Sequence, residues 1–120
     1  MHLQHITFRV KNLDESIDFY KTITELTVSR QSKVESGEIA FLTNDSGETE
    51  IELVCLLQDQ RFEGKGMFLC FMTDKLDAMH KLALEKGFNP SPIRSPDPQT
   101  RYFYVYDPNG VSVQLMQKDK

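Results

Sequence analysis

The feature that most constrains the fold of this chain is an internal repeat. Three residues of the first half recur 63 positions later, and two more recur 62 positions later. The pairs are Phe8 and Phe71, Leu13 and Leu76, and Asp14 and Asp77 at the first spacing, and Phe41 and Phe103, and Asp45 and Asp107, at the second. A nearly constant spacing over a whole segment indicates a duplicated structural unit. We therefore expect one domain of 120 residues made of two modules, about 1–63 and 64–120.

Both halves predict the same order of elements, β-α-β-β-β. In the first half, alternation of polar and apolar residues predicts a strand over 3–10, and Asn12 followed by Glu15 predicts the start of a helix that runs to about Thr24. Strands are then predicted over 26–30, 38–43 and 49–57. The second half predicts a strand over 67–73, a helix capped by Asp74 and followed by Gly87, and strands over 88–94, 101–106 and 111–117. Four of the five prolines fall within 89–100, which predicts an edge strand followed by a stiff loop.

This order predicts the fold class. Each module has one helix to cover one face of a four-stranded, mostly antiparallel sheet, and the other face stays open. We expect an α+β fold in which two curved sheets surround a cup and the helices lie outside.

Composition argues against several classes of partner. A net charge of -4 and a pI near 5.3 offer no basic surface for nucleic acid. No apolar stretch approaches the roughly 20 residues that span a bilayer, and the N-terminus lacks the pattern of a signal peptide. We expect a cytoplasmic protein without membrane partners, in which Cys55 and Cys70 are reduced strand residues rather than a redox pair.

Several segments together resemble the vicinal oxygen chelate superfamily, which includes glyoxalases, bleomycin-resistance proteins and extradiol dioxygenases. They are His-Ile-Thr-Phe-Arg-Val at 5–10, Leu-Asp-Glu-Ser-Ile-Asp-Phe-Tyr at 13–20, Glu-Ile-Glu-Leu-Val at 50–54, the stretch 101–106, Asp-Pro-Asn-Gly at 107–110 and Val-Gln-Leu at 113–115. The match spans nearly the whole chain, and the paired βαβββ fold of the family agrees with the repeat.

The resemblance implies a divalent metal site. In the family the cup often holds a metal through one residue on the first and one on the last strand of each module. Those positions fall here on His5, Glu52, Phe68 and Gln114. Three of them can ligate a divalent ion such as Zn, Ni or Mn, and strand alternation puts each of the three on the face opposite the helix. Glu52 would also be the catalytic proton carrier. Phe68 cannot bind a metal, so the resemblance implies that its ring contacts the ligand instead.

Two further residues match substrate-binding positions of the family. Arg9 matches an arginine that holds a glutathione carboxylate, although a strand-end arginine paired with an acid such as Glu52 explains it equally well. Tyr104 matches a tyrosine over the dioxygenase substrate, but it is also an ordinary strand aromatic. Leu56 and Gly64 stand where glyoxalase I has asparagine and arginine. These departures argue against a standard glutathione glyoxalase I, and the ligand set argues against an extradiol dioxygenase.

Two functions remain open. One is a glyoxalase-type lyase or isomerase that binds a small metabolite through a divalent metal held by His5, Glu52 and Gln114. The other is a metal-free protein of the bleomycin-resistance type that binds or sequesters a small molecule. We expect a homodimer in either case, with the modules paired within one chain or across two.

Overall fold

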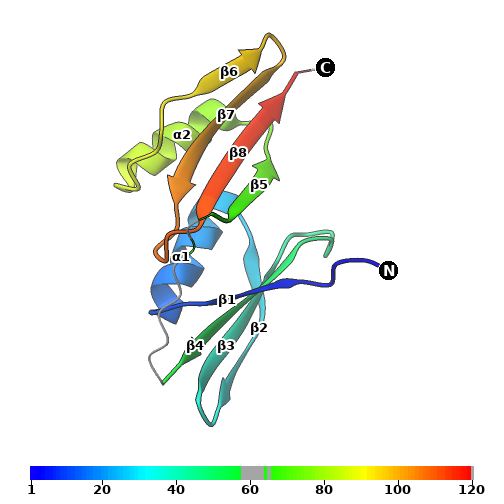
Figure 1. The fold of residues 1–120 in the computed structure, drawn as a ribbon, viewed down its shortest axis with the longest axis vertical. Helices are drawn as coiled ribbons and strands as arrows, with labels where there is room; N and C mark the ends of the chain where they lie inside the picture. The colour runs from blue at the N-terminus through cyan, green and yellow to red at the C-terminus, as the bar shows by residue number, and fades with distance from the viewer. Residues whose placement is uncertain (58–63, 65, 120) are drawn as a thin grey trace. The chain divides into compact units, whose positions relative to one another are not determined.

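The computed structural model describes residues 1–57, 64 and 66–119 and divides into two compact units, Met1–Glu63 (unit 1) and Gly64–Lys120 (unit 2) (Figure 1). Each unit has one helix and one four-stranded sheet. Neither helix in the described part of the chain is long and apolar enough to cross a membrane.

Unit 1 is built around a sheet in the order β1-β4-β3-β2. Its elements are β1 (Ile6–Arg9), α1 (Leu13–Thr24), β2 (Thr27–Val34), β3 (Gly37–Thr43) and β4 (Glu50–Leu56). β1 pairs with β4 in parallel, and the other two pairs are antiparallel. α1 begins as predicted, because the side chain of Asn12 accepts a 2.9 Å hydrogen bond from the backbone N–H of Glu15. The helix buries Phe19, Tyr20 and Ile23 on its sheet side.

Unit 2 repeats this arrangement with the order β5-β8-β7-β6. Its elements are β5 (Phe68–Met72), α2 (Leu76–Glu85), β6 (Arg94–Asp97), β7 (Thr100–Tyr106) and β8 (Ser112–Lys118). β5 and β8 are parallel, and the rest are antiparallel. The predicted fold class, an α+β chain with two mixed sheets and two helices, is therefore confirmed. The cup between the sheets stays a prediction.

The predicted cap of α2 is wrong. The helix begins after Lys75, not after Asp74, and Lys75 makes no side-chain cap bond. The Oε1 atom of Gln117 on β8 instead accepts a 3.0 Å hydrogen bond from the N–H of Leu76. A residue 41 positions away thus replaces the local cap.

The strand predicted over 88–94 is also displaced. β6 lies at Arg94–Asp97, inside the predicted loop, and contains Pro96 as an edge strand can. Pro90 and Pro92 lack the N–H groups that a ladder needs, so the preceding stretch pairs only at Ser91. The Ser91 N–H donates to the carbonyl of Tyr104 at 2.9 Å, and the Tyr104 N–H donates to Ser91 Oγ at 2.9 Å.

The structure corrects the residue matching within the repeat. Phe41 pairs with Glu52, and Tyr104 pairs with Gln114, so Phe41 corresponds to Tyr104 and not to Phe103. Phe103 is fully buried on the helix side. In the turns, Asn44 and not Asp45 corresponds to Asp107, because each accepts a 3.1 Å bond at its carbonyl from the glycine three residues later. The spacing of 63 therefore holds as far as β3 and β7. It falls to 62 for β4 and β8, because the connection from β7 to β8 is one residue shorter than the connection from β3 to β4.

Candidate functional site

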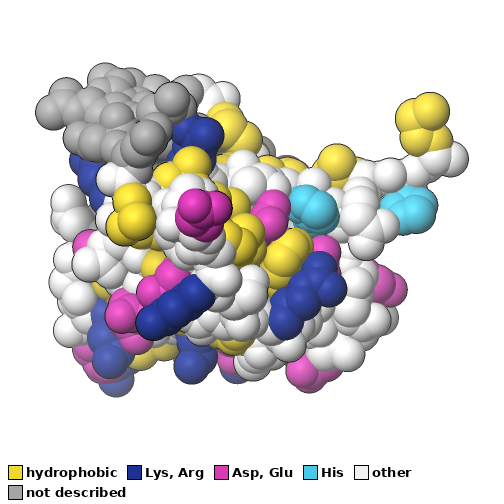
Figure 2. All heavy atoms as spheres, turned by 90° about the horizontal axis from the view of Figure 1, so that it is seen from below, with side chains coloured by type: hydrophobic (Ala, Val, Ile, Leu, Met, Phe, Trp, Pro, Cys, Tyr) yellow, Lys and Arg dark blue, Asp and Glu magenta, His cyan; other side chains and the backbone are white. Residues whose placement is uncertain are grey.

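Strand alternation gives the sheet of unit 1 one face packed on α1 and one open face. Phe8, Leu42 and Leu53 are buried on the helix side, with 0 to 1% of their surface exposed. The residues that alternate with them along the strands, among them Thr7, Phe41 and Glu52, form what we call the open face of unit 1. One row crosses all four strands of this face, with Thr7, Glu52, Phe41 and Arg30 in direct register. Figure 2 shows acidic, basic and apolar side chains close to a histidine on one face of the molecule.

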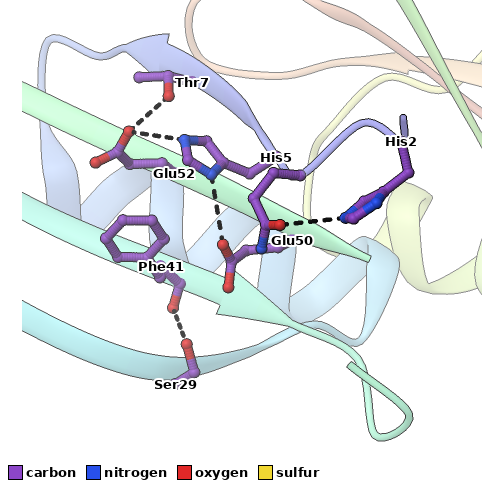
Figure 3. A network of polar contacts seen from close by, with 8 residues as sticks. His2, His5, Thr7, Ser29, Phe41, Glu50 and Glu52 are labelled. Carbon is purple, nitrogen blue, oxygen red and sulfur yellow. Dashed lines mark hydrogen bonds and ion pairs between the residues drawn. The ribbon is translucent and has the colours of Figure 1, made fainter. Parts of the chain in front are cut away.

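His5 lies between two carboxylates (Figure 3). Its Nε2 is 3.5 Å from Oε1 of Glu52, and its Nδ1 is 3.5 Å from Oε1 of Glu50. The hydroxyl of Thr7 donates a 2.6 Å hydrogen bond to the same oxygen of Glu52 that faces the imidazole. This bond follows from the parallel register, because Thr7 and Glu52 are direct neighbours on β1 and β4. The arrangement fixes one carboxylate oxygen beside one ring nitrogen.

The three side chains are partly shielded from water. His5, Glu50 and Glu52 keep 33%, 21% and 17% of their side-chain surface exposed. The Nδ1 atom of His5 is buried and has no hydrogen-bond partner among the residues that the structure describes, since Glu50 approaches only to 3.5 Å. The ring of Phe41 meets the imidazole edge-on at 5.7 Å between centroids. The pair of His5 and Glu52 is therefore accessible to a ligand but held in place on one side.

The chemistry of these donors fits part of a divalent metal site. Two ligands of one tetrahedral ion, each at about 2.1 Å, lie about 3.4 Å apart, close to the observed separation of His5 Nε2 and Glu52 Oε1. Glu50 is not placed to bind an ion held by His5 Nε2 and Glu52, because its carboxylate approaches the other nitrogen of the ring, Nδ1. Within the described ranges, no group of three or more His, Cys, Asp or Glu residues is arranged to hold a metal. A complete metal site at His5 and Glu52 would need a further ligand other than a His, Cys, Asp or Glu side chain of the described residues.

The open face of unit 2 has a different character. Gln114 lies between Cys70 on β5 and Tyr104 on β7 in direct register. The ring of Phe68, which is 66% exposed, contacts Tyr104 at 5.6 Å between centroids. Tyr102 extends the aromatic cluster at 5.5 Å from Tyr104. Burial raises the pKa of the Cys70 thiol, so this thiol stays protonated at neutral pH. This face is rich in aromatic rings and carries the amide of Gln114 at a ligand position, with the positive charge of Lys118 near Cys70 and Arg94 in register with Tyr102.

The sequence-derived site residues thus fall into two groups. His5, Glu52 and Arg9 share the open face of unit 1, and Phe68, Tyr104 and Gln114 share that of unit 2. Their convergence on one site stays a prediction. Sequence reasoning missed the contact of Glu50 with His5, and it missed the contacts that Thr7, Phe41 and Arg30 make on this face. Thr7 could have been found from its alternation with His5, but its bond to Glu52 depends on strand register.

Gly64 cannot carry the arginine that glyoxalase I has at this position. A Cβ atom at Gly64 would lie 2.6 Å from the backbone nitrogen of Val111. The Gly64 N–H also donates a 3.0 Å bond to the carbonyl of Asn109, which holds the backbone in this close approach. Leu56 follows Glu52 on the same face of β4, so the expected asparagine position is apolar.

Two other groups have structural explanations. His80 Nε2 contacts the carbonyl of Ser91 at 2.8 Å, and its ring packs edge-on against Phe103. This histidine joins α2 to the loop before β6. Cys55 and Cys70 are both free thiols.

The fold and these strand positions define a class of protein. The family model of the Glyoxalase/Bleomycin resistance protein/Dioxygenase superfamily matches residues 2–115, so the chain belongs to this superfamily.

Individual relatives agree with this assignment. The chain is 28% identical to the uncharacterized protein YwbC of Bacillus subtilis over 122 residues, which cover 97% of each chain. It is 25% identical to a lactoylglutathione lyase of Neisseria meningitidis, over 98% of this chain and 91% of the relative.

Solved structures share the fold at lower identity. The fosfomycin resistance protein FosX of Listeria monocytogenes, in complex with Mn(II) and 1S,2S-dihydroxypropylphosphonic acid, superposes with a TM-score of 0.81 at 19% identity, over 98% of this chain and 92% of FosX. The antibiotic binding protein TnmS3 of Streptomyces sp. CB03234 superposes with a TM-score of 0.80 at 21% identity, over 99% of this chain and 97% of TnmS3.

Proposed function

We propose that this protein binds a small metabolite at the His5 and Glu52 pair, and that His5, Glu52 and Gln114 hold a divalent metal ion there. The observation that carries the proposal is the 3.5 Å approach of His5 Nε2 to a Glu52 oxygen that Thr7 already holds. The lactoylglutathione lyase relative and the Mn(II) complex of FosX support metal-dependent chemistry of this class. Gln114 enters as the third ligand through the family resemblance.

Each residue has a role in the proposed lyase or isomerase reaction. When bound, a divalent ion of Zn, Ni or Mn would polarise vicinal oxygens of the substrate. Glu52 is the proton carrier, because its second oxygen stays available while Thr7 fixes the first. Arg9, Phe68 and Tyr104 contact the substrate. Water would complete the coordination of the ion beside His5, Glu52 and Gln114, since the ring of Phe68 cannot bind a metal.

A second candidate function is metal-free binding of a small molecule, as in bleomycin-resistance proteins. The observation that favours it is the aromatic contact of Phe68 with Tyr104 on the open face of unit 2. Aromatic rings in contact with one another, beside the polar amide of Gln114, suit a flat, partly apolar ligand. A structural neighbour, TnmS3, is an antibiotic binding protein.

We also propose that the protein is a cytoplasmic homodimer in which the open faces of two units enclose the ligand, within one chain or across the two. Exposed apolar side chains such as Phe68 and Met72, 66% and 61% exposed, support burial against another surface. Sedimentation of a 13.9 kDa monomer at micromolar concentration would contradict the dimer.

The metal proposal is tested by calorimetric titration of the chelator-treated protein with zinc, nickel and manganese ions. Glu52→Gln should weaken binding at least tenfold, or about 1.4 kcal/mol, because a carboxylate ligand becomes a neutral amide. Glu50→Gln is the matched control, since it removes the same charge from the same strand face beside the other ring nitrogen. Equal effects of the two variants would contradict the role of Glu52.

A gain-of-function variant tests the remaining ligands. The double change Phe68→His and Gln114→Glu supplies a second imidazole and a second carboxylate, and should raise metal affinity by well over tenfold. Negligible binding by both the natural and the doubly changed protein would refute the metal site. Metal content below roughly a tenth of an equivalent after purification without chelators would then favour the metal-free function.

A further inference from the structure

A β-bulge turns Arg30 onto the open face of unit 1. β2 and β3 pair regularly up to Val28 and Leu42, after which the register shifts so that Arg30 lies opposite Phe41. Without the bulge, Ser29 would lie opposite Phe41, and Arg30 would lie opposite Ala40, which is fully buried on the helix side. Ser29 is the extra residue, and its hydroxyl donates a 3.3 Å hydrogen bond to the carbonyl of Phe41 (Figure 3). Bulges of this kind often redirect a side chain beside a functional site.

The ring of Phe41 connects Arg30 to the histidine of the proposed site. The guanidinium carbon of Arg30 lies 3.9 Å from the centroid of the Phe41 ring, a cation–π contact. The same ring meets His5 edge-on at an angle of 88°. The positive charge is therefore held one aromatic ring away from the imidazole.

No acidic side chain in the described ranges pairs with Arg30. Its side chain is exposed, and it forms no ion pair and no side-chain hydrogen bond with the residues that the structure describes. The nearby carboxylates of Glu50 and Glu52 face the two nitrogens of His5 instead. Stacking on a ring leaves the in-plane N–H groups of a guanidinium available, and these donors match the two oxygens of a carboxylate or phosphonate.

We infer that Arg30 forms a subsite for an oxyacid anion, a carboxylate or a phosphonate, carried by the ligand that meets His5 and Glu52. This inference rests on the proposed function and names the chemical class of its ligand. The bulge sets the position of the guanidinium, and the ring of Phe41, which also contacts His5, supports it.

The test is titration of the ¹⁵N-labelled 120-residue chain with lactate, with uncharged lactamide and with (1-hydroxyethyl)phosphonate, followed by amide chemical shifts. Lactate or the phosphonate should shift amides of β2 and β3 around Arg30 and Phe41, and lactamide should bind at least tenfold more weakly. Arg30→Met should lower affinity for the anion by tenfold or more, and Arg30→Lys should recover only part of it. The control is Lys33→Met, which removes one exposed charge from the same strand.

The outcomes separate the two proposals. Equal losses in Arg30→Met and Lys33→Met, or equal affinity for lactate and lactamide, would overturn the Arg30 subsite, as would the absence of binding by either anion. Binding that depends on Glu52 but not on Arg30 would leave the proposed function standing and overturn only this inference. Anion binding that depends on Arg30 but is indifferent to Glu52→Gln and His5→Gln would support the subsite and contradict the proposed function.

Discussion

Replacement of Gln117 by leucine should destabilise the protein through the start of α2. The side-chain carbonyl of Gln117 accepts the only hydrogen bond that the Leu76 N–H makes among the described residues, at 3.0 Å. Leucine has a similar volume but no acceptor, so the substitution removes the bond with little change in packing.

The magnitude follows from the burial of this bond. A lost helix cap costs about 0.5–2 kcal/mol, and a fully buried N–H left without a partner costs about 1–3 kcal/mol. The Leu76 N–H is only partly buried, so water replaces some of the lost interaction. We expect a loss of about 1–1.5 kcal/mol and a fall in melting temperature of about 3–6 °C.

Thermal and urea denaturation followed by circular dichroism would measure the effect. Gln99→Leu is the control, because the Gln99 side chain is exposed and, within the described part of the chain, Gln99 makes hydrogen bonds through its backbone alone. Lys75→Asn offers α2 a local cap, so it should restore part of the stability that Gln117→Leu removes. Its stabilising effect should be larger in the Gln117→Leu variant than in the natural chain. A Gln117→Leu variant as stable as Gln99→Leu would refute the reasoning.

Three further predictions concern other contacts. Gly64→Ala should destabilise the protein by about 1–3 kcal/mol in urea denaturation, because the added Cβ meets backbone of the β7–β8 turn at 2.6 Å, and wild-type stability would show that this turn gives way. The hydrogen bond from Arg101 lowers the pKa of Asp77 in the folded protein. The ionised carboxylate therefore stabilises the folded state fully above pH 3.8, the ordinary pKa, and this contribution is lost as the pH falls through the lower pKa of the folded protein. The natural protein should therefore lose more stability than Asp77→Asn in acid melting curves, and parallel curves would contradict this. Thr7→Val should weaken metal binding by Glu52 about tenfold in calorimetric titration, because the carboxylate loses its 2.6 Å hydrogen bond, and unchanged affinity would show that Thr7 does not orient it.

The sequence alone determined the duplicated architecture and the face on which each candidate residue lies. Periodicity is a local property of the backbone, so alternation in β1 and β4 was enough to place His5 and Glu52 opposite the helix. The cap of α1 was predictable for the same reason, because Asn12 and the N–H it binds are three residues apart.

Only the tertiary structure decided which residues meet. The bond from Thr7 to Glu52 requires the parallel register of β1 and β4, and the cap of α2 comes from a strand 41 residues away. Arg30 reaches Phe41 only because one extra residue in β2 reverses the alternation that the sequence suggests. Strand registers, bulges and remote caps depend on contacts between segments that are distant in the chain, and local periodicity carries no information about such contacts.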